Sequence, residues 1–137
     1  MLAVLESGRS GFFGARARVD KFLGIAMNAI ARKLDAIREK GRMGAVDVAN
    51  FLNIRPETVS RWKQGKAFPR PEAQKRLMEL EYIVDQLSDI YSPDEARLWL
   101  YSRQKLLSGD IPAALIQSGR TDEVLAVIDQ LREGVFI

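Results

Sequence analysis

The chain has 137 residues, of which 47% are apolar and 28% are charged, and its formal net charge is +3. It contains no cysteine and no histidine, which excludes disulfides, thiolate nucleophiles, imidazole general bases and the usual zinc ligands. No apolar run approaches the roughly 18 residues of a membrane span, and the N-terminus lacks the continuous apolar segment of a signal peptide. We therefore expect a cytoplasmic protein that is not an enzyme and has no metal, no cofactor and no small-molecule substrate.

The charge is divided unevenly between the two halves of the chain. Residues 1–70 hold 14 Lys/Arg and 6 Asp/Glu, a net charge of +8, whereas residues 71–137 hold 7 and 12, a net charge of −5. Such an asymmetry favours separate binding partners for the two halves. The basic half suits a polyanion, which would repel the acidic half.

The first 40 residues divide at about Val19. Three glycines stand among arginines in residues 1–17 without the spacing of a phosphate-binding loop, so we interpret this segment as a flexible basic arm. From Val19 to Lys40, apolar residues recur every three or four positions, which predicts a helix that ends at Gly41. Its expected apolar face comprises Phe22, Leu23, Ala26, Met27, Ile30, Leu34 and Ile37.

Residues 45–65 predict two short helices joined by a sharp turn. Val46, Ala49 and Leu52 recur at helical spacing and give the first helix one apolar stripe. Asn53 stands at the turn, where it tolerates the left-handed backbone conformation better than most residues. Arg55 occupies the N-cap position of the second helix, although its side chain cannot accept an amide hydrogen bond.

The second helix combines one buried face with one polar face. Pro56 is suited to the first helical position, Val59 and Trp62 share a face that can pack on the first helix, and Gly65 ends the helix. The polar side chains that remain can hydrogen-bond base edges and phosphates. This arrangement is that of the recognition helix of a helix-turn-helix. The candidate DNA-binding residues are Arg55, Glu57, Thr58, Ser60, Arg61, Lys63 and Gln64, with Lys40 and Arg42 as candidates for phosphate contacts.

The remaining segments also have helical patterns. After a proline-containing loop at residues 66–71, a helix is expected at residues 72–91, with an apolar stripe wide enough to pack on both neighbouring units. Ser92 and Glu95 form a capping box for a helix to about Tyr101, whose inward residues are Ala96, Leu98, Trp99 and Leu100. A helical turn at residues 104–107 follows. Asp110 and Thr121 are the expected caps of helices at residues 111–117 and 122–132, and Gly134 ends the last helix.

Two resemblances to known families refine this interpretation. Ala49, the turn Asn53-Ile54 and the run from Thr58 to Trp62 followed by Gly65 resemble the Xre/Cro family of DNA-binding domains. The C-terminal half resembles the toxin-binding domain of the MbcA/ParS/Xre antitoxin family. That resemblance depends on Trp99, Gln104, Leu107, Gly109, Pro112, Leu115, Ile116, Gly119, Val124, Val127, Ile128, Leu131 and Gly134.

The second resemblance implies an all-α fold, with an Xre-like helix-turn-helix bundle followed by a small helical toxin-binding domain. The expected divisions are the arm at residues 1–17, a DNA-binding domain at 18–70, a connecting core helix at 71–91 and the toxin-binding domain at 92–137. The expected contacts with the toxin are the exposed residues after Trp99 and the apolar C-terminal tail. They are Tyr101, Ser102, Arg103, Lys105, Val135, Phe136 and Ile137.

Family members neutralise toxins of the RES class, which consume NAD. The resemblance therefore implies an antitoxin that binds such a toxin, occludes its active site, and represses its own operon by binding operator DNA as a homodimer. The alternative is a free-standing dimeric helix-turn-helix transcriptional regulator whose C-terminal domain only dimerises. A toxin gene beside this one would distinguish these two hypotheses.

Overall fold

In the computed structural model, the backbone of residues 2–134 and the side chains of residues 18–134 are described. Within that range every regular element is a helix and there is no strand, which confirms the all-α expectation. The elements are α1 (Leu2–Gly41), α2 (Ala45–Leu52), α3 (Pro56–Lys63), α4 (Pro71–Ser88), α5 (Pro93–Tyr101), the 3₁₀ turn η1 (Lys105–Leu107), α6 (Pro112–Gln117) and α7 (Thr121–Glu133).

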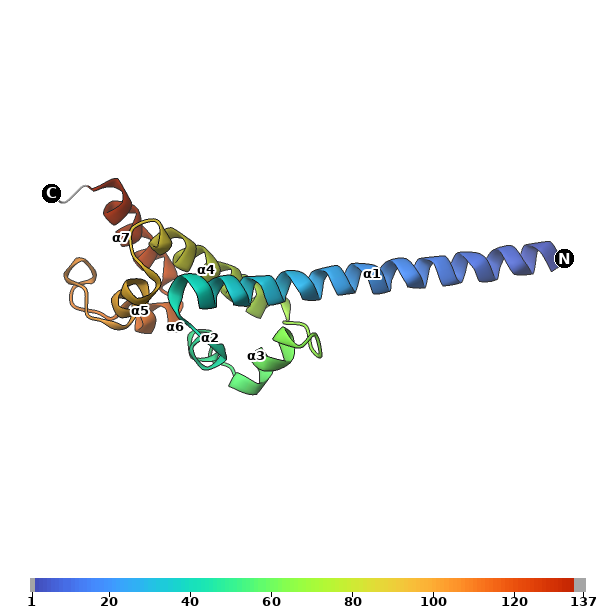
Figure 1. Ribbon diagram of the computed structural model, residues 1–137, viewed down its shortest axis with the longest axis horizontal. Helices are drawn as coiled ribbons and strands as arrows, with labels where there is room; N and C mark the ends of the chain where they lie inside the picture. The colour runs from blue at the N-terminus through green and yellow to red at the C-terminus, as the bar shows by residue number, and fades with distance from the viewer. Residues whose placement is uncertain (1, 135–137) are drawn as a thin grey trace.

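Helix α1 is much longer than the sequence pattern predicts. Its backbone is helical from Leu2, so the segment interpreted as a flexible arm continues the helix expected from Val19. Only the C-terminal part of α1 packs on the rest of the molecule, and the other part extends away from it (Figure 1). Ile30, Leu34 and Ile37 are buried as expected. The prediction that Phe22 and Leu23 face the core is wrong, because none of the other helices that the structure describes covers that turn of α1.

The turn between α2 and α3 forms as the residue types predict. Asn53 has a φ of 56°, in the left-handed region, and the amide of Ile54 donates to the carbonyl of Ala49 at 3.0 Å. The buried side of α2 consists of Val48, Ala49, Phe51 and Leu52. The placement of Val46 on that side is wrong, since its side chain is 59% exposed and the stripe is rotated toward Val48 and Phe51.

Helix α3 packs on α1 and α2 through two side chains. Pro56 is its first residue, and Val59 and Trp62 are buried as predicted. Arg55 makes no side-chain hydrogen bond at the N-cap, in agreement with its chemistry. The chain then leaves the helix through Gly65, whose φ of +73° suits a residue without a Cβ.

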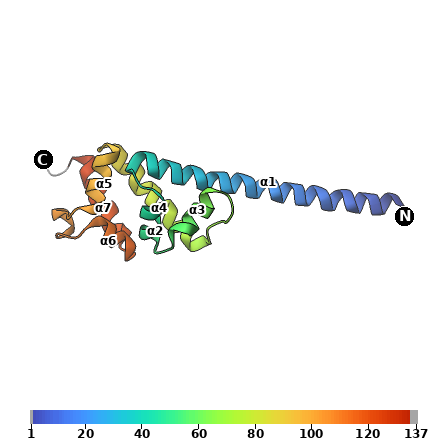
Figure 2. The same ribbon diagram turned by 60° about the horizontal axis from the view of Figure 1, so that its bottom comes forward.

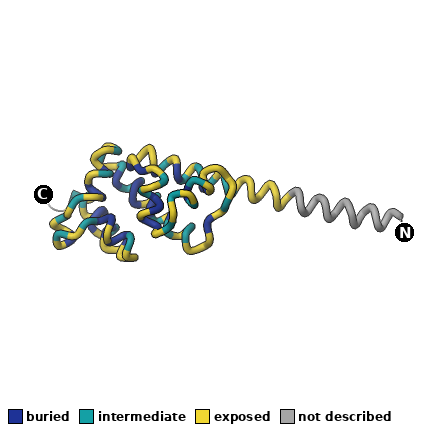
Figure 3. The backbone as a smooth tube through the Cα atoms, turned by 90° about the horizontal axis from the view of Figure 1, so that it is seen from below, coloured by how far each residue is buried: buried dark blue, intermediate teal, exposed yellow. Residues whose placement is uncertain are grey.

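Helix α4 joins the two halves of the molecule. It packs against α1 and α2 and also against α5 and α7 (Figure 2). Leu77, Leu80, Ile83 and Leu87 have no exposed surface, so this helix supplies the centre of the core. The buried residues form one cluster that runs from α1 to α7 through both halves. Figure 3 shows where these residues lie along the backbone.

The C-terminal helices follow the predicted order but not all of the predicted caps. Ser92 and Glu95 form the capping box of α5, with reciprocal hydrogen bonds of 3.0 and 3.3 Å. Asp110 does not cap α6, because Pro112 takes the first helical position and Ile111 becomes the N-cap. Thr121 does not cap α7 either, since it is a buried residue inside the first turn.

Candidate functional site

The polar face of α3 is available for binding. Arg61 and Glu57 are exposed and one helical turn apart, so their side chains point from the same face of the helix. The other candidates on this unit divide into exposed and half-buried side chains. Arg55, Lys63 and Gln64 are exposed, while Thr58 and Ser60 are half-buried.

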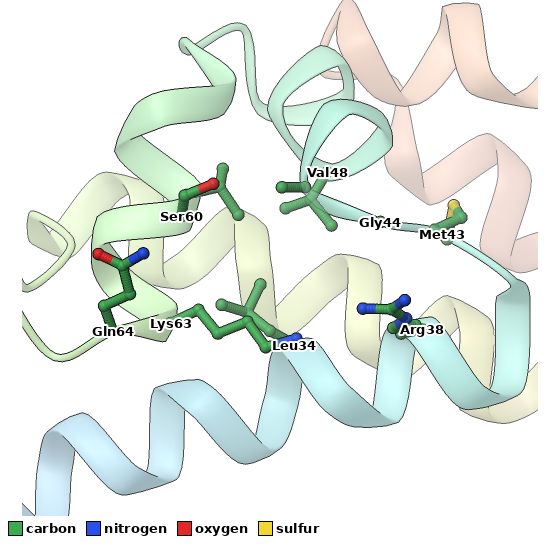
Figure 4. A pocket seen from close by; sticks show the side chains of 10 residues that line it. Leu34, Arg38, Met43, Gly44, Val48, Ser60, Lys63 and Gln64 are labelled. Carbon is green, nitrogen blue, oxygen red and sulfur yellow. The ribbon is translucent and has the colours of Figure 1, made fainter.

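A cavity of about 250 Å³ lies between α3, the start of α2 and the C-terminal part of α1 (Figure 4). Its apolar lining includes Leu34 and Val48, and its polar lining comes from Lys63 and Gln64 of α3 and Arg38 of α1. No ion pair of Arg38 occurs among the residues whose side chains are described. The fold therefore places a further cation beside the polar face of α3.

The two cations expected to contact phosphate are engaged with acidic side chains. The Nζ atom of Lys40 lies 2.6 Å from Asp85 on α4, and the Nε atom of Arg42 lies 3.0 Å from Asp94 on α5. The hydrogen bond with Asp85 raises the pKa of Lys40. Both cations are exposed, but their charge is partly balanced by these acids, so Arg38 is better suited to a phosphate contact.

A polar cluster fixes the start of α2 against α5. Asp47 accepts hydrogen bonds from the amide of Gly44 at 3.1 Å, from Arg97 at 2.9 Å and from the hydroxyl of Tyr101 at 2.9 Å. Burial by itself would raise the pKa of Asp47, but these three hydrogen bonds outweigh it and hold the pKa below its usual value. For Tyr101, burial and then the bond to Asp47 both raise the pKa of the phenol.

This cluster gives Tyr101 a structural role besides the expected toxin contact. Its ring lies 5.8 Å from the ring of Phe51 on α2, and the guanidinium of Arg97 stands 5.0 Å from the ring centroid. The side chain is still 37% exposed at one edge. Its hydroxyl is committed within the molecule, so only that edge of the ring is free to meet a partner.

A second exposed surface lies where α5 passes into η1. Arg103 and Lys105 are exposed and Ser102 is half-buried, with its hydroxyl donating to the carbonyl of Leu98. Leu98 and Leu106 are 68% and 50% exposed on the same segment. Two large apolar side chains beside two cations are typical of a protein-binding surface.

The exposure of Leu98 corrects its predicted place in the core. Trp99, Leu100 and Ala96 are buried, and they occupy one face of α5 at spacings of one, three and four residues. Leu98 falls outside that face, so the spacing of these residues in the sequence could have predicted its exposure. The expected tail contacts Val135, Phe136 and Ile137 lie outside the described residues.

The described part of the chain shows no group of three or more acidic, histidine or cysteine side chains arranged to hold a metal ion. None of the helices whose residues are described is both long enough and apolar enough to cross a membrane. What the fold presents is a small all-α protein with a polar exposed surface on α3 and a mixed apolar and cationic one on the α5–η1 segment.

Comparison with known proteins identifies the family. The mycobacterial cidal antitoxin MbcA of Mycobacterium tuberculosis is 32% identical over 113 residues, which covers 82% of this chain and all of MbcA. A probable mycobacterial cidal antitoxin of the same species is 30% identical over 104 residues, which covers 76% of this chain and 88% of the relative. No family model matches the sequence.

A solved structure agrees with these relatives. One chain in the crystal structure of the M. tuberculosis MbcT–MbcA toxin–antitoxin complex superposes with a TM-score of 0.69 and 34% sequence identity, covering 78% of this chain and 96% of that chain. The chain described here belongs to the MbcA-like antitoxin family. Its relatives are antitoxins and not enzymes, which agrees with the expectation from the sequence.

Proposed function

We propose that this chain neutralises a toxin of the RES class, which consumes NAD, by binding it and occluding its active site. We further propose that it acts in the cytoplasm and represses its own operon by binding operator DNA as a homodimer. MbcA occurs in a complex with the toxin MbcT, which supports a toxin partner for this member of the family.

The observation that supports two binding activities is the separation of the two exposed surfaces. The α3 surface combines Arg61 and Glu57 with the cation Arg38, residue types that bind base edges and phosphates. Lys63 adds a second cation there, whose charge is partly balanced by Asp35 at 3.5 Å. The α5–η1 surface instead has exposed leucines, whose apolar side chains are suited to a protein partner and not to the phosphates of DNA. In Figure 1, α3 lies toward the extended part of α1, whereas α5 lies at the other end of the folded part, near α6 and α7. This arrangement supports separate ligands for the two surfaces.

The proposed toxin contacts are the exposed apolar and cationic side chains of this second surface. Leu98 and Leu106 would enter apolar recesses of the toxin, while Arg103 and Lys105 would meet acidic side chains at the rim. Ser102, the free edge of Tyr101 and the tail residues Val135, Phe136 and Ile137 complete the proposed contact set.

The experiment that tests this proposal is co-expression with the product of the adjacent gene. We expect that product to arrest growth alone, and growth and co-purification to be restored by the wild-type chain. Arg61→Ala should retain neutralisation and weaken operator binding by about 1–3 kcal/mol, since it removes one base-reading side chain. Leu98→Glu should show the reverse pattern, because its exposed side chain can change without disturbing the core.

The two variants act as controls for each other. Loss of both activities in either variant would contradict two independent surfaces. A harmless neighbour that forms no complex, together with intact operator binding, would favour the free-standing regulator.

A further inference from the structure

The apolar face of α1 continues beyond the part of this helix that packs on the other helices. Ile30, Leu34 and Ile37 pack into the core at spacings of four and three residues. Toward the N-terminus, Ala26, Leu23 and Val19 continue the same line at spacings of four, three and four. We call the line formed by these six residues the α1 stripe.

Outside the core, the α1 stripe is exposed. Val19 and Leu23 are 56% and 43% exposed, and Phe22 beside them is 68% exposed. These three side chains present roughly 300 Å² of apolar surface, as much as the largest patch on a typical monomer. A solvated helix has no need of such a face, so this part of α1 is built to pack against something.

The charged residues next to Val19 and Leu23 lie to the side of the stripe and do not interrupt it. Arg18, Asp20 and Lys21 fall about 80° or more from its centre on a helix of 3.6 residues per turn. The apolar line also extends beyond the described side chains in the sequence itself. Leu5 and Phe12 precede Val19 and Ala26 at a seven-residue spacing, and Gly8, Ala15 and Phe22 stand three residues after Leu5, Phe12 and Val19, which gives the two positions per heptad of a coiled-coil seam. Arg9 and Arg16 border this line in the sequence.

We propose that the exposed part of the α1 stripe, from Val19 to Ala26, packs against the same part of a second copy of this chain. An apolar line with heptad spacing is self-complementary, as a two-fold interface requires. The described side chains of two copies bury about 600 Å², half of what a stable interface needs. Helix α1 continues to Leu2, so two paired helices have the length to supply the remainder.

This inference rests on the proposed homodimer and assigns it a surface. Pairing through α1 leaves both α3 faces uncovered, because the paired segment lies away from the α2–turn–α3 unit (Figure 1). Two recognition surfaces held by one rigid helical pair suit an operator with two half-sites.

The test compares two substitutions on the same helix. Val19 and Ile25 are both β-branched and both 56% exposed, but Ile25 lies about 120° around the helix from Val19, off the stripe. Val19→Glu places a charge in the paired seam, whereas Ile25→Glu places the same charge at its side. Neither residue is buried, so both variants should keep the wild-type helical circular dichroism.

Sedimentation equilibrium on the full chain measures the result. We expect the wild type to be a dimer, Val19→Glu to weaken self-association roughly tenfold or more, and Ile25→Glu to change it less than about twofold. A monomeric wild type at 100 μM would overturn both the homodimer and its surface. A dimer that Val19→Glu does not weaken would overturn the surface alone.

The other possible occupant of the α1 stripe is the toxin, and co-purification with the product of the adjacent gene tests for it. If Val19→Glu remains dimeric but loses the toxin, then the toxin occupies the α1 stripe and the proposal is overturned. If Val19→Glu becomes monomeric and still neutralises the toxin, the pairing of α1 and the antitoxin activity are independent, as we propose.

Discussion

Single side chains decide how the start of α2 is held. Asp47 is the clearest case, since one carboxylate accepts hydrogen bonds from its own helix terminus and from two residues of α5. Its position in the first turn also favours a negative charge, because the N-terminal amides and the helix dipole are electropositive there. The ionised form of Asp47 is therefore a feature of the folded state.

The lowered pKa of Asp47 predicts a pH dependence of stability. A carboxyl whose pKa is lower in the folded than in the unfolded state binds fewer protons when folded, so it stabilises the fold above the ordinary value of 3.8. This contribution is lost as the pH falls through the lowered folded pKa. Asp47→Asn should therefore cost about 1–3 kcal/mol at pH 7 and progressively less below pH 3.8.

Urea unfolding of both proteins at several pH values measures this difference. Asp89→Asn is a suitable control, because Asp89 is exposed and its one ion pair among the described side chains is with the exposed Arg132 at 3.0 Å. A cost of Asp47→Asn that stays constant from pH 7 to pH 3 would show that charge is not the reason for its effect.

At the scale of elements, the helix N-termini show where residue types close in the sequence are enough to predict a cap. The capping box at Ser92 and Glu95 formed as predicted because all its partners lie within four residues of one another. The predicted cap at Asp110 is wrong because Pro112 is favoured at the first helical position, which makes Ile111 the N-cap. The predicted cap at Thr121 is wrong because tertiary packing buries this residue inside the helix.

Removal of the capping box should destabilise α5 by a modest amount. We expect Ser92→Ala to cost about 1 kcal/mol of unfolding free energy, since the amide of Glu95 loses its acceptor. Glu95→Gln should cost less, because glutamine can also close the box. Thermal unfolding of the three proteins tests this, and equal stabilities of wild type and Ser92→Ala would contradict it.

At the scale of the whole molecule, one arginine joins helices that are distant in the sequence. Arg76 on α4 donates hydrogen bonds to the carbonyls of Phe51 and Leu52 at the end of α2 and of Ile116 and Gln117 at the end of α6. The last carbonyls of a helix have no partner within it, and a cation is favoured at that end. Two helix ends from the two halves are therefore satisfied by the same side chain.

Loss of this guanidinium should weaken the connection between the halves. Arg76→Met keeps the length of the side chain but removes the donor of the Phe51 and Leu52 carbonyls, which should cost about 2–3 kcal/mol. The carbonyls of Ile116 and Gln117 keep hydrogen bonds from the amide of Gly119 and the side chain of Asn53. Lys75→Met on the exposed side of the same helix should change stability by less than about 0.5 kcal/mol. Denaturant unfolding followed by Trp62 and Trp99 fluorescence measures both, and equal effects of the two changes would rule out this role for Arg76.

The sequence by itself determined the order of the helices, the turn at Asn53 and the burial of Val59 and Trp62. These features depend on interactions within a few residues of the chain, which spacing and residue type reveal. It also sufficed for the family, because the resemblance drawn from its residues agrees with a relative that is 32% identical over 82% of this chain. The charge difference between the halves likewise needed no structure.

The tertiary structure alone decided which exposed residues are free to bind. Lys40 and Arg42 look like phosphate ligands in sequence, but the fold brings Asp85 and Asp94 beside them. Leu23 and Leu98 look like core residues, but within the described residues both are left exposed. These outcomes depend on contacts between residues far apart in the chain, and the local pattern of apolar and charged residues is the same whether or not such a neighbour exists.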